Sequence, residues 1–290
     1  MRFTLSLGMG GYQDYNKVAV TAEKAGWSSI CIPDSVFFPK TSESNYPYAE
    51  TATVRKFLSQ TPFIEPFVAM AAMAALTQKI RFFPSVLKVP SRQPLLLAKS
   101  LGSLAVICDN RVSLGAGIGP WKEDFTYNGL AFEKRGKMLD ECIDIIRGVL
   151  SGEFFEYHGQ HYDFGPLKMS PAPSKAVPIL IGGHSKAALA RAARMGDGWV
   201  SANADYQTIK TMIGQLSNLR DEYQTQDRTD FEIHAFDQNA NTLDQFKRLR
   251  DIGVTDICTS LWNVYMHETE VQTKLDRISR FGDEVISCFE

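Results

Sequence analysis

A glycine turn in the second half of the chain has the clearest potential to bind a ligand. Gly182 and Gly183 follow the apolar run Ile179–Ile181, and His184 and Ser185 open a segment with small apolar residues at helical spacing. The order strand, glycine turn and helix leaves free N–H groups beside a backbone without side chains, which favours a bound phosphate. The pattern is equally typical of a tight strand-to-helix connection that binds nothing.

A second candidate group stands at the end of another expected strand, Ser28–Pro33. Asp34 and Ser35 follow it and precede a long polar segment, residues 36–62. Asp34 is the one carboxylate that we expect directly at a strand end facing this segment. We interpret it either as a group that orients a polar heterocycle or substrate, or as a helix cap. A segment of this length without clear periodicity is typical of a functional lid.

Other motifs argue against several kinds of chemistry. The GAGIG run, residues 115–119, lacks the third-glycine spacing of a nicotinamide-binding fingerprint. His158 and His161 lie in an expected hairpin without carboxylate or thiolate partners at ligand spacing, so we predict no metal site. The GxSxG pattern of a serine nucleophile is absent. Glycines and aromatic residues with few acid or base groups suit a site where an organic cofactor carries out the chemistry.

Composition argues against a nucleic-acid or membrane partner. The 290 residues carry a net charge of −2, and the basic residues form no run. Five cysteines lie far apart without a CxxC pair, which is typical of reduced thiols in the cytoplasm. The N-terminus shows no signal-peptide pattern, and the longest apolar stretch, Phe67–Leu76, is too short to span a bilayer. We therefore expect a cytoplasmic protein.

The elements that must position these groups alternate along the chain. Short apolar runs predict eight strands, which are Arg2–Leu7, Ser28–Pro33, Ile80–Lys88, Arg111–Ala116, Ile179–Ile181, Gly198–Ala202, Phe231–Phe236 and Thr255–Ser260. Helical patterns separate them and end with Glu268–Ile286. Residues 151–177 predict an inserted hairpin between strands four and five.

Eight strand–helix units predict one α/β domain over residues 1–290, a (β/α)8 TIM barrel. A doubly wound open sheet is the competing architecture. The active site of a barrel lies at the carboxyl ends of its strands. That rim would hold Gly8–Tyr12, Asp34, Ser35, Ser85, Val86, Gly117–Trp121, Gly182–Ser185, Asn203 and the loop after Ser260.

Four long stretches resemble the luciferase-like monooxygenases, and in particular their branch that depends on coenzyme F420, a deazaflavin. They are residues 61–125, beginning TPFIEPF; FEKRGKMLDECIDIIRGVLSGE; the hairpin YHGQHYDF; and PILIGGHSKAALARAARMGDGW. The resemblance implies a luciferase-like barrel that binds a flavin or deazaflavin at its rim, as a homodimer. It also implies a cis peptide bond at Ser85–Val86, beside the cofactor ring.

The resemblance further implies roles for individual residues. The resemblance implies that the cofactor phosphate binds at Gly182, Gly183, His184 and Ser185. It also implies that Asp34 contacts the cofactor ring. Many F420-dependent relatives have a histidine, which exchanges a proton, where this chain has Ser35. A serine hydroxyl cannot replace imidazole in donating or accepting a proton near neutral pH. Glu65 and Trp121 are then candidates for the group that supplies the proton.

These features lead us to expect an oxidoreductase that passes a hydride between F420 and a small organic substrate. One alternative is an FMN-dependent monooxygenase supplied with reduced flavin by a partner reductase. Another is a non-catalytic barrel, which the intact glycines disfavour and the absence of the histidine favours.

Overall fold

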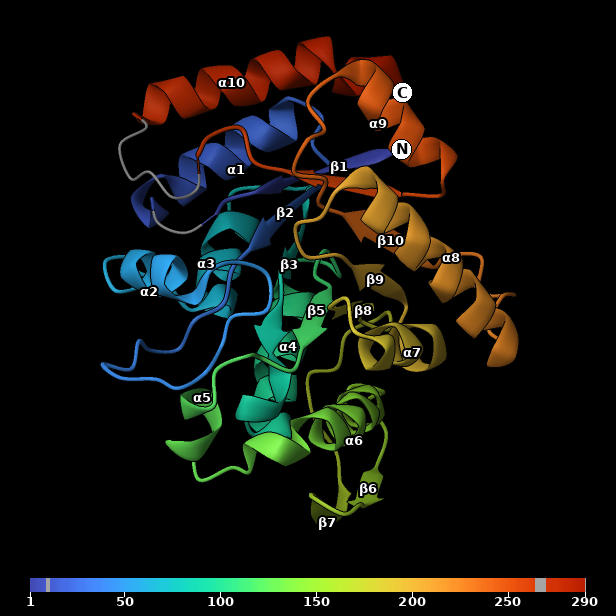
Figure 1. Cartoon of the computed structure of the whole chain (residues 1–290). Helices are drawn as coiled ribbons and strands as arrows, with labels where there is room; N and C mark the ends of the chain where they lie inside the picture. Colours follow the sequence, from blue (N-terminus) through green and yellow to red (C-terminus); the bar gives the residue numbers. More distant parts are fainter. Residues whose placement is uncertain (9–10, 264–269, 290) are drawn as a thin grey trace.

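A wall of parallel strands surrounds the centre of the molecule in the computed structural model, which describes residues 1–8, 11–263 and 270–289 (Figure 1). Neighbouring strands follow the order β3-β2-β1-β11-β10-β9-β8-β5-β4. Their bounds are β1 Arg2–Ser6, β2 Ser29–Ile32, β3 Arg81–Pro84, β4 Leu87–Lys88, β5 Leu114–Gly117, β8 Ile179–Gly182, β9 Gly198–Val200, β10 Glu232–Ala235 and β11 Asp256–Thr259. The predicted barrel is confirmed, and each of the eight predicted strands is present.

The third predicted strand is divided into β3 and β4. Between them lies the Ser85–Val86 peptide bond, which is cis, as the resemblance implies. β3 pairs with β2, whereas β4 pairs with β5. The amide of Phe82 in β3 also donates to the carbonyl oxygen of Arg111, at 2.8 Å, just before β5. The divided strand therefore closes the barrel and turns residues 85 and 86 towards its mouth.

Helices cover the outside of the strands (Figure 1). Their bounds are α1 Tyr15–Lys24, α2 Thr51–Leu58, α3 Pro66–Ala74, α4 Pro94–Ile107, α5 Glu123–Thr126, α6 Arg135–Val149, α7 Lys186–Met195, α8 Tyr206–Glu222, α9 Leu243–Asp251 and α10 Val271–Glu284. Short 3-10 turns lie at Tyr12–Asp14, Val89–Ser91, Phe132–Lys134 and Ile286–Phe289. Within the described part of the chain, no helix is long and apolar enough to cross a membrane.

The segment 36–62 contains a helix that the sequence did not predict. This helix is α2, and its N-cap Glu50 accepts hydrogen bonds from the amides of Ala52 and Thr53. The helix is only eight residues long, and none of the usual cap residues Ser, Thr, Asp or Asn precedes it. The local sequence therefore gave too little signal to predict it. The predicted start of the last helix, Glu268, lies outside the described residues, as do Met9 and Gly10 of the expected rim.

The predicted hairpin is also confirmed. β6 Phe155–His158 pairs in antiparallel fashion with β7 Asp163–Leu167, between β5 and β8 in the sequence. The Glu141 carboxylate on α6 accepts hydrogen bonds from the amides of Gln160, His161 and Tyr162, which fastens the hairpin to that helix.

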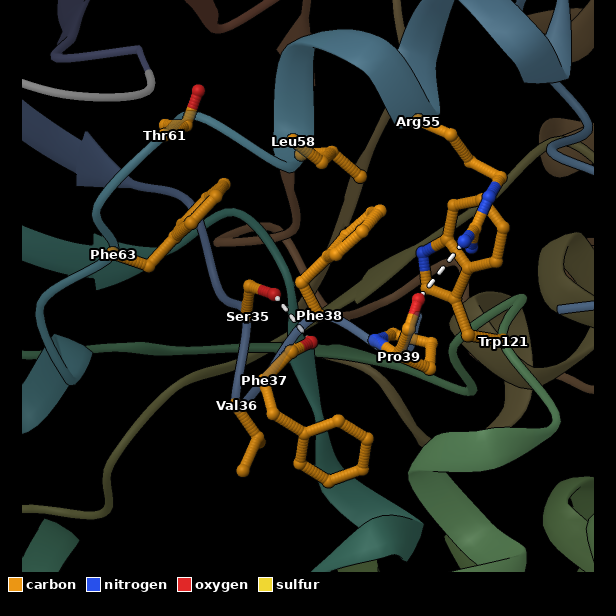
Figure 2. A pocket seen from close by; sticks show the side chains of 10 residues that line it. All are labelled: Ser35, Val36, Phe37, Phe38, Pro39, Arg55, Leu58, Thr61, Phe63 and Trp121. Carbon is orange, nitrogen blue, oxygen red and sulfur yellow. Dashed lines mark hydrogen bonds between the residues drawn. The ribbon is translucent and has the colours of Figure 1, made fainter. Parts of the chain in front are cut away.

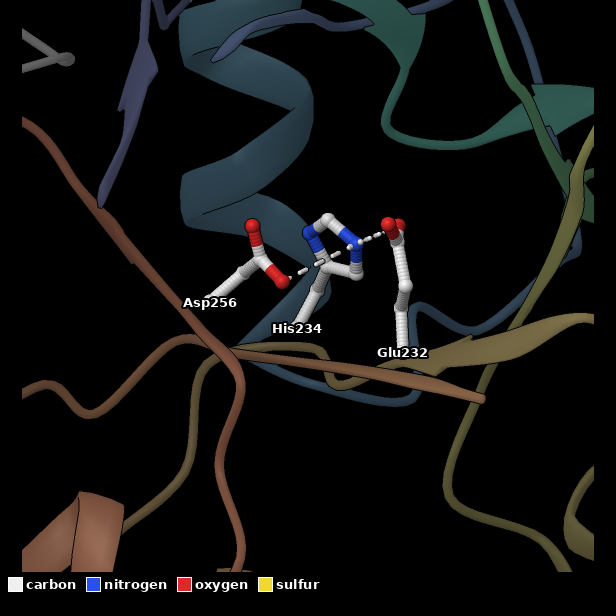
Figure 3. A group of neighbouring side chains, drawn as sticks. All are labelled: Glu232, His234 and Asp256. Atoms are coloured by element: carbon white, nitrogen blue, oxygen red, sulfur yellow. Dashed lines mark hydrogen bonds and ion pairs between the residues drawn. The ribbon is translucent and has the colours of Figure 1, made fainter. Parts of the chain in front are cut away.

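The amino-terminal ends of several strands hold a buried charge cluster at the end of the barrel opposite the mouth. His234 lies between Glu232 and Asp256, with Nε2 at 2.8 and 3.7 Å from their carboxylates (Figure 3). Arg2 pairs with both carboxylates, and Arg81 pairs with Glu232. The two guanidinium groups balance the two carboxylates, so we assign this cluster to stability rather than to a metal site.

Candidate functional site

The glycine turn between β8 and α7 packs against Val86, Ala188 and Tyr48. Gly183 has a φ of +120°, a conformation that other residues rarely adopt. A Cβ on Gly183 would lie 3.1 Å from the Cβ of Ala188, and one on Gly182 would lie 2.7 Å from Cγ1 of Val86. The absence of both side chains lets Val86 and Ala188 pack closely against the turn. The turn leads directly into the N-terminus of α7, where backbone amides suit the phosphate of a cofactor.

The residues after the glycines complete the turn. The Ser185 side chain caps α7 by accepting a hydrogen bond from the amide of Ala188 at 3.2 Å. The ring of His184 lies with Nε2 3.2 Å from the carbonyl oxygen of Ala202. Burial lowers the pKa of His184, so its imidazole is neutral at neutral pH. A phosphate at this turn would meet backbone amides and the positive end of the helix.

Val86 lies between the carboxyl ends of β5 and β8. Its side chain packs against Gly182 and against Gly117 of the GAGIG run, where a Cβ would lie 2.5 Å from Cγ2 of Val86. The glycines at the ends of β5 and β8 thus make room for the bend at Ser85–Val86. The role of GAGIG is packing against this bend, which local sequence spacing could not indicate.

Asp34 lies beside the same bend with its carboxylate fully buried. Arg92 donates to both of its oxygens, at 2.7 and 2.9 Å, and the amide of Lys88 donates to Oδ2 at 2.9 Å. Asp34 therefore caps no helix, and it ties the end of β2 to β4 and to the turn Val89–Ser91.

A second buried ion pair lies next to this one. Lys88 Nζ contacts Asp124 Oδ2 at 2.6 Å, and both side chains are almost completely buried. Burial raises the pKa of Asp124 although the Lys88 charge opposes this effect. Sequence reasoning missed Lys88, Arg92 and Asp124. One signal in the sequence could have indicated these ion pairs. Lys88 and Arg92 are two cations, four residues apart, at the end of an apolar strand.

A pocket of about 120 Å³ opens beside Ser35 (Figure 2). It is lined mainly by apolar and aromatic side chains from the segment after β2, from α2 and from the loop after β5, which are Val36, Phe37, Phe38, Pro39, Leu58, Phe63 and Trp121. Its polar groups are Ser35, Thr61 and Arg55. The guanidinium of Arg55 lies 4.7 Å from the centre of the Phe38 ring and donates to the carbonyl oxygen of Pro39.

The structure separates the candidates for proton exchange. Ser35 and Trp121 share the pocket, and the Ser35 hydroxyl lies 3.5 Å from the carbonyl oxygen of Phe37. Glu65 is exposed and is not part of the pocket lining; its carboxylate caps α3 by accepting from the amide of Val68 at 3.0 Å. In the structure Glu65 is therefore the cap of α3, and its carboxylate does not reach the pocket.

Comparisons with known proteins agree with this architecture. A model of the luciferase-like monooxygenase family matches residues 3–250. An uncharacterised protein of Mycobacterium tuberculosis is 44% identical over 290 residues, which are 99% of each chain.

Two solved structures share the fold over the whole chain. A monooxygenase of Streptomyces bottropensis has a TM-score of 0.77 at 16% identity and covers 100% of both chains. The coenzyme F420-dependent tetrahydromethanopterin reductase of Methanopyrus kandleri has a TM-score of 0.75 at 15% identity, covering 100% of this chain and 99% of that one. At these identities the similarity concerns the fold alone.

Proposed function

Because the chain belongs to the luciferase-like monooxygenase family, we propose that it is an oxidoreductase that uses F420 to transfer a hydride to or from a small organic substrate. The observation that carries this proposal is the glycine turn at Gly182–Ser185, which lies beside Val86 and leads into the N-terminus of α7. The proposal places the cofactor phosphate at this turn and the planar ring beside Val86. The deazaflavin, when bound, supplies the hydride chemistry.

The protein's own residues would bind and orient. The turn and the N-terminus of α7 hold the phosphate, and Ser85 and Val86 support the ring. Asp34, fixed by Arg92, orients the polar edge of the ring. The Ser35 hydroxyl orients a substrate oxygen without exchanging a proton.

The pocket beside Ser35 supports a small, largely apolar substrate. A cavity of roughly 150 Å³ lined by apolar side chains accommodates benzene in another protein, and this pocket of about 120 Å³ is of similar size. Arg55 already donates to backbone carbonyl oxygens of the segment after β2, so its charge serves to hold that segment. We therefore place small, largely apolar compounds first in a substrate screen.

Titration of the purified protein with F420 and with FMN, followed by cofactor fluorescence, tests the proposal. We expect tight binding of F420 and weak binding of FMN. A preference for FMN would contradict hydride transfer from a deazaflavin and favour a monooxygenase supplied by a partner reductase. Binding of neither cofactor would favour a non-catalytic barrel.

A further inference from the structure

The side chain of Tyr48 lies in the glycine turn, although it comes from the segment between β2 and α2. Its ring meets the imidazole of His184 edge to face, with the ring centres 5.1 Å apart. Its hydroxyl oxygen lies 3.7 Å from the position that a Cβ on Gly183 would occupy. The hydroxyl thus lies directly beside the glycine turn.

Contacts with the loop after β5 hold this part of the segment in place. Ser42 donates to the Glu123 carboxylate at 2.9 Å, and Ser44 accepts from the amide of Lys122 at 2.8 Å. The ring of Tyr46 stacks on Trp121 at 6.0 Å. The segment therefore crosses the barrel mouth from β2 to β8 with anchors at Ser42, Ser44 and Tyr46, and Tyr48 follows two residues after the last of them.

A phosphate at the turn needs hydrogen-bond donors. Burial lowers the pKa of His184, and the single N–H of a neutral imidazole is directed at the carbonyl oxygen of Ala202, so this side chain has no further donor. Burial raises the pKa of Tyr48, so the phenol keeps its proton at neutral pH. That proton can be donated. A phosphate would be the strongest acceptor available to that proton.

We infer that the Tyr48 hydroxyl donates a hydrogen bond to the phosphate of the cofactor held at Gly182–Ser185. The segment after β2 is then part of the phosphate site as well as of the substrate pocket. The inference rests on the proposed function, because it assigns a further residue to the same cofactor.

The experiment compares cofactors with and without phosphate. Dissociation constants of FMN and riboflavin, and of F420 and its form without the phosphate and tail, are measured by fluorescence for the wild type and for Tyr48→Phe. We expect Tyr48→Phe to weaken binding of the phosphorylated forms by about tenfold to a hundredfold, the range for a hydrogen bond to a charged group, and to leave the other forms unchanged. Tyr127→Phe is the matched control, since Tyr127 is exposed and stacks on Phe37 of the same segment.

The possible outcomes separate the inference from the proposed function. If the wild type prefers the phosphorylated cofactors and Tyr48→Phe keeps the same preference, the inference is wrong and the proposed function stands. Tighter binding by Tyr48→Phe would also overturn the inference, because it would mean that Tyr48 competes with the phosphate. If the wild type binds none of these cofactors, both fail.

Discussion

Arg92 holds Asp34 through two parallel hydrogen bonds, Nη2 to Oδ1 at 2.7 Å and Nη1 to Oδ2 at 2.9 Å. The Asp34 side chain is fully buried and that of Arg92 is 18% exposed. This pair joins the end of β2 to the turn after β4 and sets the direction of the carboxylate at the barrel mouth. A planar guanidinium can make both bonds at once, whereas an ammonium group cannot.

The first prediction follows from that geometry. Arg92→Lys keeps the charge but loses the paired hydrogen bonds, so we expect the free energy of unfolding to fall by about 1–3 kcal/mol. Urea denaturation measures it. Arg147→Lys is the control, because its ion pair with Asp197 lies at the surface, where such pairs contribute about 0–1 kcal/mol. Equal losses in the two variants would contradict a special role of the Asp34–Arg92 geometry.

The Lys88–Asp124 pair allows a double-mutant test. Lys88→Met leaves the buried Asp124 without its cation, and we expect a loss of about 3–5 kcal/mol in unfolding free energy. The double variant Lys88→Met/Asp124→Leu removes both charges and should recover most of that loss. Chemical denaturation of the single and double variants measures the coupling. Additive losses would show that the pair is not coupled.

Phosphate binding at the glycine turn can be tested without disturbing the backbone. A side chain at Gly183 would be strained by the φ of +120°, so a change there would confuse binding with folding. Ser185→Asp keeps a good helix cap and places a negative charge at the anion site. We expect FMN or F420 to bind more weakly, on the order of tenfold, while riboflavin is unaffected.

Ser185→Asn is the matched control for this experiment, because asparagine also caps helices well but carries no charge. Its affinity for the phosphorylated cofactor should stay close to that of the wild type. Equal weakening by Asp and Asn would point to the shape of the turn rather than to its charge. No weakening by Asp would argue that the phosphate binds elsewhere.

The charge cluster around Glu232 predicts a dependence of stability on pH. Burial tends to raise the pKa of Glu232, but hydrogen bonds from His234 and Arg81 and the Arg81 charge outweigh it and hold the pKa well below its usual range. The stabilisation is therefore present above the unfolded-state pKa of about 4.3 and is lost as the pH falls through the folded-state pKa.

Denaturation at a series of pH values from 7 to 3 measures this effect. Glu232→Gln should be less stable by about 3 kcal/mol at pH 7, and its stability should fall less steeply with acid than that of the wild type. Glu153→Gln, at an exposed position, should keep the wild-type slope. An unchanged slope in Glu232→Gln would mean that other carboxylates govern acid unfolding.

The resemblance to homodimeric proteins can be tested on the outer face of α3 and α4. These packed helices expose large apolar side chains, which are Val68, Leu96, Val106 and Ile107, and Leu76 follows the end of α3. Apolar surface of this kind is typical of an interface. We expect the wild type to sediment as a dimer and Leu96→Glu to sediment as a monomer, because the charge would be buried against the second copy.

Phe154→Glu serves as the control, because Phe154 is also exposed but lies before β6, on another part of the molecule. It should remain a dimer. Dissociation of both variants would argue against an interface on α3 and α4, and a monomeric wild type would contradict the dimer itself.

The chain's local patterns were sufficient for the strands of the barrel, although not for α2. The runs RFTLSL, SSICIP and PILIG, each between turn residues, predicted β1, β2 and β8. These predictions succeeded because a strand or helix that buries one face must repeat apolar residues along its own length. The glycine turn was visible for the same reason, since its glycines and cap lie within four consecutive residues.

Only the tertiary structure decided the partners at the barrel mouth. Asp34 is an isolated acid in the sequence, and closure of the barrel brings it to Arg92 and to the amide of Lys88. Tyr48 reaches the turn after β8 only because the segment after β2 crosses the mouth. Such contacts join residues far apart in the chain, and no local periodicity encodes them. They exist because parallel strands bring their carboxyl ends to one rim, where side chains from separate strands and loops meet.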